Sequence, residues 1–239
     1  MAQRYKRNIR KDIEKVIATE SRRRGRSLPE VEENAVMDTL LEYLLSAAKS
    51  KSAIKHTDIK YCVIPDHAKY YPNLMAKAKA VLLQVFGYKL IGTGGQKLIL
   101  VNSLRREEIS PEGEDVPTQI LLLLVLSHIF ISGEPCKEVS VINYLARLNI
   151  WRDHGGLHPY FGNIEEMLRK TFVNQFYLVR SRTAEIGKET FEYLWGPRAK
   201  AEFDAKTVVE YVSEVTKNLP ATGWTFQNQR ACSPETPAA

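Results

Sequence analysis

The stretch of sequence that decides the fold lies in the C-terminal third of the chain and reads Glu192-Tyr193-Leu194-Trp195-Gly196-Pro197-Arg198-Ala199-Lys200-Ala201-Glu202-Phe203. Aromatic residues recur at every second position, at Phe191, Tyr193 and Trp195, which is the period of a half-buried strand. Pro197 has a fixed φ angle that suits the first turn of a helix. We therefore predict that a strand passes directly into a helix at Gly196. Taken alone, this pattern is typical of core architecture rather than of a functional site.

Composition indicates two small domains. The chain has 239 residues, of which 44% are hydrophobic, and this is enough for real cores. The longest apolar run, residues 120–131, is shorter than the roughly 20 residues that cross a bilayer, so we predict a buried helix there. No secretory leader opens the sequence, which favours an intracellular protein. The three cysteines, Cys62, Cys136 and Cys232, are too scattered for a disulfide framework or a zinc site, and they fit a cytosolic or nuclear location.

Charge is segregated along the chain. Residues 1–30 hold 10 Lys/Arg and 4 Asp/Glu, and this segment alone accounts for the net charge of +6. Residues 107–140 hold 7 acidic residues and 1 basic residue, whereas residues 31–106 are basic. Such segregation suits a polyanion partner, with simple solvation of surface lysines as the alternative. The cluster Arg22-Arg23-Arg24-Gly25-Arg26 interrupts residues 1–30, which sustain no apolar face as a whole. We expect a flexible basic arm that serves nuclear import, contacts phosphates or is simply a solvated tail.

The first half of the chain has a helical pattern followed by a strand pattern. A helix is predicted over residues 36–48 from the apolar stripe Val36, Met37, Leu40, Leu41, Leu44, Leu45 and Ala48. Ile54, Ile59 and Val63 predict a short second helix after the cap-like pair Thr57-Asp58. A third helix over residues 71–86 is expected to end in a left-handed cap at Gly87. Residues 88–91 and 97–101 then flank the turn 92–95 and predict a β-hairpin.

The same order recurs in the second half. Helices are predicted over residues 118–131 and 138–148, and Asn163 with Glu166 forms a capping pair for a third helix that ends near residue 175. Strands over residues 177–182 and 190–195 form a second hairpin. A final helix over residues 197–218 is expected to bury Val208, Val209, Val212 and Val215.

The predicted fold class is therefore mainly α with small β-hairpins (α+β), organised as tandem winged-helix domains. The predicted organisation is a basic flexible arm (1–30), a first winged helix (31–106), an acidic linker (107–117), a second winged helix with a C-terminal helix (118–219), and a flexible tail (220–239).

Several segments together resemble the MAGE homology domain over residues 34–225. They are Glu42-Tyr43-Leu44-Leu45, Gln84-Val85-Phe86-Gly87-Tyr88, His158-Pro159-Tyr160-Phe161-Gly162, Thr171-Phe172-Val173-Asn174-Gln175-Phe176-Tyr177-Leu178, and Trp195-Gly196-Pro197-Arg198-Ala199. The resemblance implies tandem winged helices that act as a non-enzymatic partner of RING-type ubiquitin ligases. In the family's most general role, a member bridges a RING-type ubiquitin ligase subunit and a kleisin subunit in the SMC five/six chromosome complex. The insert 183–188 and the loop 154–156 depart from the family pattern.

The resemblance implies two protein-binding sites. Leu44 and Leu45 match the family's dileucine, which binds the RING partner, although at least one of them must face the core. A kleisin helix would need an apolar groove in the second winged helix. Candidate walls of that groove are Phe172, Phe176, Leu178 and Leu194, with ordinary core packing as the alternative for each.

Winged helices commonly place the third helix in the major groove of DNA and the hairpin on its backbone. Candidate DNA-binding residues are Lys69, Lys77, Lys79 and Lys97 in the first unit and Arg169, Lys170, Arg180 and Arg182 in the second. Few side chains on either third helix suit base reading, so we expect binding to double-stranded DNA without sequence specificity. A surface role in solvation is the alternative for each residue.

Catalysis has little support in the sequence. The run Gly92-Thr93-Gly94-Gly95-Gln96-Lys97 joins two strands and lacks a P-loop ending, so it is a turn. His154 and His158 lie on a glycine loop with no matching ligands, and His128 belongs to an apolar helix. We expect no enzyme activity, no metal and no cofactor. The leading interpretation is a nuclear, chromatin-associated scaffold that acts in DNA repair. The alternatives are a regulator or substrate adaptor of another RING ligase and a sequence-specific transcription factor.

Overall fold

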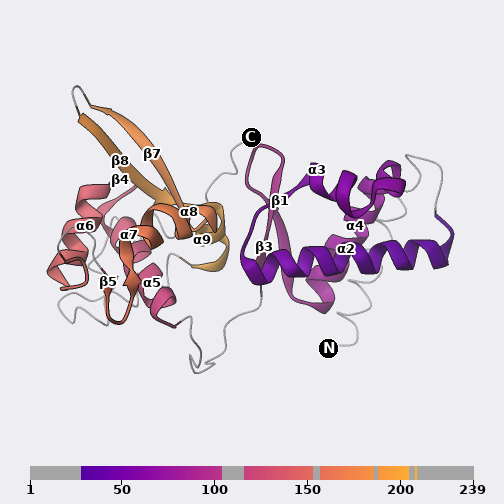
Figure 1. Ribbon diagram of the computed structural model, residues 1–239, viewed down its shortest axis with the longest axis horizontal. Coiled ribbons are helices and arrows are strands. Elements are labelled where there is room, and N and C mark those ends of the chain that lie inside the picture. The colour runs from indigo at the N-terminus through magenta and orange to yellow at the C-terminus, as the bar shows by residue number, and fades with distance from the viewer. Residues whose placement is uncertain (1–27, 104–115, 153–156, 186–187, 205–207, 209–239) are drawn as a thin grey trace, which may run out of the picture. The chain divides into compact units, whose positions relative to one another are not determined.

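The computed structural model describes residues 28–103, 116–152, 157–185, 188–204 and 208. The chain divides into two compact units, Met1–Arg105 and Arg106–Ala239. Each unit contains the order helix, short strand, two helical segments and hairpin (Figure 1). This confirms the predicted α+β class and the tandem winged helices. The predicted arm up to residue 27, the linker up to residue 115 and the tail 220–239 lie outside the described residues.

The first unit is built from one long helix, a set of short helical segments, a second long helix and a three-stranded antiparallel sheet of order β1-β3-β2. Its elements are α2 (Glu30–Ser50), β1 (Ile54–Lys55), α3 (His56–Asp58), the π-helical η1 (Ile59–Val63), the 3-10 helix η2 (Pro65–Tyr70), α4 (Tyr71–Val85), β2 (Tyr88–Gly92) and β3 (Lys97–Asn102).

Helices α2 and α4 supply most of the core of the first unit. The buried positions of α2 are Leu40, Leu44 and Ala47. Acidic side chains in its first turn stabilise the helix, because their negative charge lies near the positive end of the helix dipole. Helix α4 buries a matching stripe that includes Leu74, Ala78 and Leu82. Gly87 follows α4 with a φ angle of 68°, so the predicted left-handed residue is confirmed.

The start of the second helical segment differs from the prediction. Ile54 lies in strand β1 opposite Leu98, not in a helix. Thr57 and Asp58 are inside α3, whose N-cap is the extended residue Lys55 and which has no side-chain cap. The reason is tertiary: the apolar side chain of Ile54 is fully buried by pairing with a strand that lies more than 40 residues further along the chain.

The second unit repeats this arrangement with a longer hairpin, which extends outward from the body of the unit (Figure 1). Its sheet has the order β4-β8-β7. The elements are α5 (Val116–Ser132), β4 (Cys136–Lys137), α6 (Glu138–Arg147), β5 (Leu157–His158), β6 (Gly162–Asn163), α7 (Ile164–Glu166), the π-helical η3 (Met167–Thr171), α8 (Phe172–Asn174), β7 (Leu178–Glu185), β8 (Lys188–Trp195) and α9 (Pro197–Glu202).

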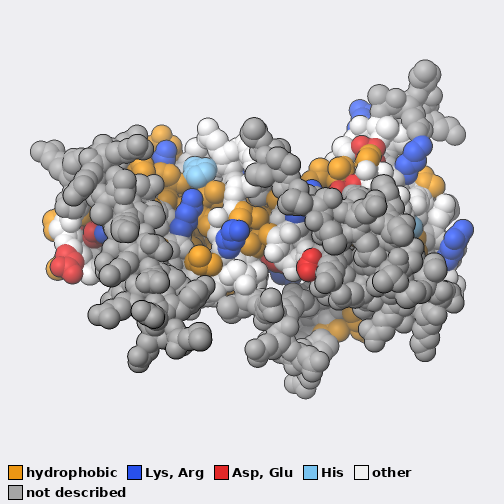
Figure 2. All heavy atoms as spheres, turned by 180° about the vertical axis from the view of Figure 1, so that it is seen from behind, with side chains coloured by type: hydrophobic (Ala, Val, Ile, Leu, Met, Phe, Trp, Pro, Cys, Tyr) orange, Lys and Arg blue, Asp and Glu red, His pale blue; other side chains and the backbone are white. Residues whose placement is uncertain are grey.

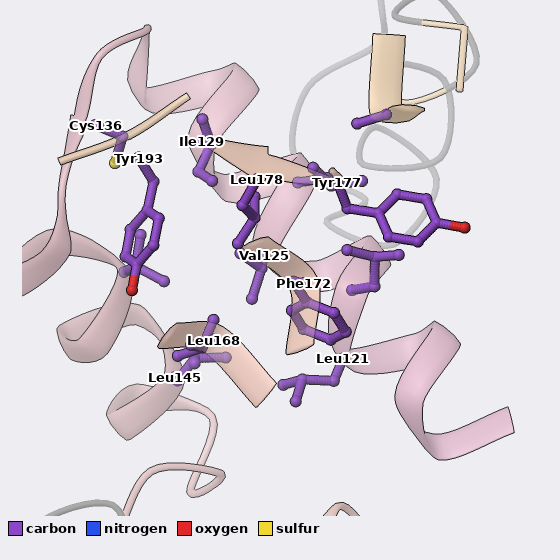
Figure 3. Packing of buried hydrophobic residues seen from close by; sticks show 14 of the residues in the cluster. Leu121, Val125, Ile129, Cys136, Leu145, Leu168, Phe172, Tyr177, Leu178 and Tyr193 are labelled. Carbon is purple, nitrogen blue, oxygen red and sulfur yellow. The ribbon is translucent and has the colours of Figure 1, made fainter. Parts of the chain in front are cut away.

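The core of the second unit lies between α5, the third-helix segments and the inner face of the hairpin. Figure 3 shows side chains from these elements converging, with Phe172 and Leu178 beside Val125 of α5. Tyr193 and Trp195 are buried, as the alternating pattern predicts. The predicted capping pair is also confirmed, because the Asn163 side chain accepts a hydrogen bond of 3.1 Å from the backbone N–H of Glu166.

The helix predicted over residues 197–218 is interrupted after its first six residues, and Val208 is helical again, with its backbone N–H donating to the carbonyl of Asp204 at 3.1 Å. Helix α9 stops at Glu202, and Phe203 has an extended backbone with φ −115° and ψ 127°. In this extended conformation the Phe203 ring packs against Tyr177, with 6.3 Å between the ring centroids. Val208 is buried as predicted, and Val209, Val212 and Val215 lie outside the described residues. No helix in the described part of the chain is both long enough and apolar enough to span a membrane.

Candidate partner and nucleic-acid interfaces

The Trp195-Gly196-Pro197-Arg198 segment joins the hairpin to the end of the third helix. The backbone N–H of Gly196 donates to the carbonyl of Tyr177 at 2.8 Å, and that of Arg198 donates to the carbonyl of Phe176 at 3.0 Å. A Cβ atom at Gly196 would lie only 2.2 Å from the carbonyl oxygen of Phe176. Glycine is therefore required here by the close approach of two backbones.

Arg198 is a structural residue of this joint. Its side chain is 2% exposed, and its Nε donates to the carbonyl of Gln175 at 2.7 Å. One terminal nitrogen pairs with Glu202 at 3.2 Å, and the guanidinium lies 5.7 Å from the ring centre of Tyr177. The guanidinium thus satisfies a carbonyl at the end of α8, where helices leave carbonyls without partners. The most recognisable motif of the chain stabilises the fold.

The two leucines of the predicted RING-partner site have different environments. Leu44 is fully buried in the core of the first unit, whereas Leu45 is half-buried at its edge. A partner that binds the folded unit can contact Leu45 directly, and Leu44 would act by holding α2 in place.

The four predicted kleisin-binding residues are also divided between core and surface. Phe172 and Leu178 are buried beside α5 (Figure 3). Phe176 and Leu194 keep part of their surface exposed. Leu194 lies opposite Val179 in the hairpin, and Val179 is 43% exposed. The local sequence pattern does not indicate Val179, because only the strand register places it on the same outer face as Leu194.

The predicted DNA-binding side chains of the second unit all form ion pairs. Arg169 pairs with Glu138 at 2.7 Å and also with Glu165. Arg180 pairs with Glu138 at 2.9 Å and stacks on Phe191, with its guanidinium 3.4 Å from the ring centre. The other two pairs are Lys170 with Glu166, at 3.8 Å, and Arg182 with Glu189.

Glu138 is the centre of this network and was not predicted from the sequence. Glu138 is 7% exposed, and its carboxylate accepts hydrogen bonds from Arg169, Arg180 and, at 3.4 Å, the hydroxyl of Tyr193. Burial alone would raise the pKa of Glu138, but the hydrogen bonds and charges of the two arginines outweigh burial and lower it. Burial, together with the charge of Glu138, raises the pKa of Tyr193. This network ties α6, η3 and the hairpin together.

The predicted lysines of the first unit are less engaged. Lys77 pairs with Glu33 of α2, and Lys69 lies over the ring of Tyr70, 4.9 Å from its centre. Lys79 and Lys97 are exposed. Neither of them forms an ion pair with another residue that the structure describes.

The histidines have structural partners. The Nδ1 atom of His158 accepts hydrogen bonds from the backbone N–H groups of Tyr160 and Phe161, at 3.1 and 3.2 Å. His128 stacks on Tyr144 and hydrogen-bonds to Ser140 at 3.0 Å. His154 lies outside the described residues. Within the described ranges, no group of three or more His, Cys, Asp or Glu side chains is arranged to hold a metal ion.

Comparison with known proteins gives the family. Residues 92–206 match the MAGE homology domain. The Mus musculus protein named Non-structural maintenance of chromosomes element 3 homolog is 32% identical over 201 residues, which cover 82% of this chain and 71% of that relative. The chain belongs to the MAGE homology domain family. This confirms the resemblance drawn from its motifs.

Two further relatives match similar lengths of the chain. The Homo sapiens protein of the same name is 32% identical over 82% of this chain and 65% of the relative. Melanoma-associated antigen F1 of Homo sapiens is 30% identical over 84% of this chain and 66% of that protein. The chain thus spans about two thirds of the length of these relatives. A solved structure titled Nse1-Nse3-Nse4 complex has a TM-score of 0.78 and 30% identity, and the match covers 86% of this chain and 100% of that chain.

Proposed function

We propose that this MAGE chain is a non-catalytic scaffold subunit of the SMC five/six chromosome complex. In this role it bridges a RING-type ubiquitin ligase subunit and a kleisin subunit, in the nucleus and on chromatin. The observation that carries the proposal is the match to the chain from the Nse1-Nse3-Nse4 complex, because it extends over both winged helices. A chain that matches only one unit would share a domain with that complex but not a bridging architecture.

Each unit has partly exposed apolar side chains, and this supports one contact surface on each unit. In the first unit, half-buried Leu45 on α2 is the proposed contact with the RING subunit. In the second, the outer face of the hairpin carries Val179 and Leu194, and Phe176 lies at the end of the third helix. Partly exposed apolar side chains of this kind suit the hydrophobic face of a helix from the kleisin. Phe172 and Leu178 support these residues from within the core.

The scaffold also binds double-stranded DNA without sequence specificity in this proposal, which places it in DNA repair and genome maintenance. The exposed lysines Lys79 and Lys97 of the first unit are the main candidates, because the arginines of the second unit are already bound to carboxylates. Contacts made by lysine to phosphates do not read sequence, so unrelated duplexes of equal length should bind equally. Strong discrimination between duplexes at fixed salt would instead identify a transcription factor.

A second candidate function is regulation of another RING ligase, or recruitment of substrates to it. The similarity to Melanoma-associated antigen F1, which extends over 84% of the chain, favours this alternative. In this case the first unit would use Leu45 for its RING partner, and the chain would have no kleisin partner.

Affinity capture of the tagged chain from its own cells, after nuclease treatment and with mass spectrometry, separates the two functions. Recovery of a RING protein together with a kleisin and SMC subunits is the result expected for the scaffold. Recovery of a RING ligase without SMC subunits would reject the scaffold in favour of the adaptor. Reconstitution of the three-subunit complex from purified proteins, followed by size-exclusion chromatography, then tests whether the contacts are direct.

A further inference from the structure

Two lysines face each other across the short β1–β3 pair of the first unit. Lys55 is the register partner of Lys97, and both side chains are exposed. Like charges directly opposite each other on neighbouring strands destabilise a sheet, whereas opposite charges stabilise it. The chain therefore keeps an unfavourable pair at this edge, and an anion bound between the two ammonium groups would relieve the repulsion.

Two further lysines, Lys60 of η1 and Lys79 of α4, lie near His56, the residue after Lys55. His56 follows Lys55 directly, and its backbone N–H donates to the carbonyl of Gln96, beside Lys97, at 3.3 Å. Burial lowers the pKa of His56, and the positive charges of Lys60 and Lys79 lower it further. Lys60 also lies 4.8 Å from the ring centre of Tyr71, whose hydroxyl hydrogen-bonds to the His56 side chain. Figure 2 shows lysine side chains near a histidine on this unit.

We define the β1–α4 lysine cluster as Lys55, Lys60, Lys79 and Lys97. Two acidic residues of the unit are bound to side chains outside the cluster. Glu32 pairs with His67, and Glu33 pairs with Lys77. No lysine of the cluster forms an ion pair within the described residues, although Asp58 follows two residues after His56 and hydrogen-bonds to Thr57. The cluster therefore projects a local positive field, which attracts polyanions.

The aromatic groups beside the cluster indicate which kind of nucleic acid fits it. Proteins that bind single strands stack bases on exposed aromatic side chains. Tyr71 is only 8% exposed, and His56 is half-buried and bonded to it. Tyr61, which follows Lys60 in η1, is 73% exposed and could stack on one base, but successive unpaired bases need several such rings. The four lysines offer charge to a phosphate backbone, and this favours a duplex.

We propose that the β1–α4 lysine cluster is a phosphate-binding site for the backbone of double-stranded DNA, formed by the first winged helix alone. This inference rests on the proposed DNA binding and assigns its main site. Lys55 and Lys60 are part of the site, although the third helix and the hairpin loop do not contain them. Lys77 is outside it, because its ammonium group is bound to Glu33.

The test is fluorescence anisotropy of a labelled random-sequence duplex, titrated with the full chain over a series of salt concentrations. Lys55→Gln/Lys97→Gln should lower affinity about tenfold and reduce the slope of log K against log salt by about 2, because two phosphate contacts are lost. Lys60→Gln/Lys79→Gln should have a similar effect. The matched control Lys49→Gln/Lys89→Gln removes the same charge from exposed positions of the unit outside the cluster and should change affinity by less than about twofold.

Each outcome of this test has one meaning. Equal losses in the cluster and control variants, or no loss in the cluster variants, would overturn this site while leaving DNA binding in place. Tighter binding of a single strand of the same length would overturn the assignment to duplex DNA. A wild-type chain that binds no duplex would reject the DNA-binding part of the proposed function. Equal melting temperatures of the variants and the wild type exclude unfolding as the cause of any loss.

Discussion

The carbonyl oxygen of Phe176 lies where a Cβ atom of residue 196 would have to be, 2.2 Å from the position that such an atom would take. We therefore expect Gly196→Ala to destabilise the second unit by about 3 kcal/mol, because the hairpin and the third helix must separate to make room. Urea denaturation followed by tryptophan fluorescence measures the change. Gly92→Ala is the control, since a Cβ there meets nothing within 4 Å, and it should cost less than about 0.5 kcal/mol.

Arg198 should be as important as Gly196 for stability. Arg198→Met keeps much of the side-chain volume but leaves the carbonyl of Gln175 and the carboxylate of Glu202 without their partner. We expect a loss of about 3 kcal/mol in the free energy of unfolding, as for other buried charges that lose a partner. Lys170→Met removes only an exposed pair and should change stability by less than about 0.5 kcal/mol. Equal effects of the two substitutions would contradict the structural role of Arg198.

Glu138 should make the stability of the second unit depend on pH. Its pKa is lowered in the folded state, so its stabilising contribution is present above the unfolded pKa, about 4.3, and is lost as pH falls through the lower folded value. Glu138→Gln should therefore destabilise by about 2 kcal/mol at neutral pH, and the difference from the wild type should shrink below about pH 4. Thermal melts at several pH values measure this difference. Glu165→Gln, which affects an exposed pair with Arg169, should show neither effect.

Substitution of Leu44 should lower the stability of the first unit, whereas substitution of Leu45 should lower its affinity for the RING subunit. Leu44→Ala leaves a cavity in the core and should cost about 3 kcal/mol of stability. Leu45→Ala should keep the fold and weaken binding of the purified RING subunit about tenfold, as measured by calorimetry, because the apolar contact of a half-buried side chain is lost. Wild-type affinity in a folded Leu45→Ala variant would mean that the RING subunit binds elsewhere.

Lys77 and Lys79 should contribute unequally to DNA binding. Lys79→Gln should weaken binding of all duplexes alike and reduce the salt slope by about 1, as expected for one phosphate contact. Lys77→Gln should have a smaller effect, because its ammonium group already pairs with Glu33. The comparison needs only the two single variants and one duplex. A larger effect of Lys77→Gln would mean that the ion pair with Glu33 opens when DNA binds.

The sequence by itself determined the main helices, the two hairpins and their order. The apolar stripe of α4, the left-handed Gly87, the capping pair Asn163–Glu166 and the alternation through Tyr193 and Trp195 all act between residues close in the chain. Helix periodicity, turn geometry and capping are local properties of the backbone, so they can be read without knowing the fold. The repeated order of three helices and a hairpin extended this reading to the tandem winged-helix architecture, and the family motifs imply the same architecture.

The tertiary structure decided which side chains remain available. Ile54 became a strand residue because it pairs with Leu98, and Leu44 faces the core while Leu45 does not. Lys77 pairs with Glu33, which lies 44 residues away in the sequence, and Arg180 pairs with Glu138, which lies 42 residues away. Lys55 and Lys97 instead lie opposite each other on neighbouring strands. Such pairings depend on the packing of distant elements and on strand register, and a shift of one residue in a strand moves every side chain to the other face. The local sequence therefore does not show which side chains pair, because the pairing is set when distant elements pack together.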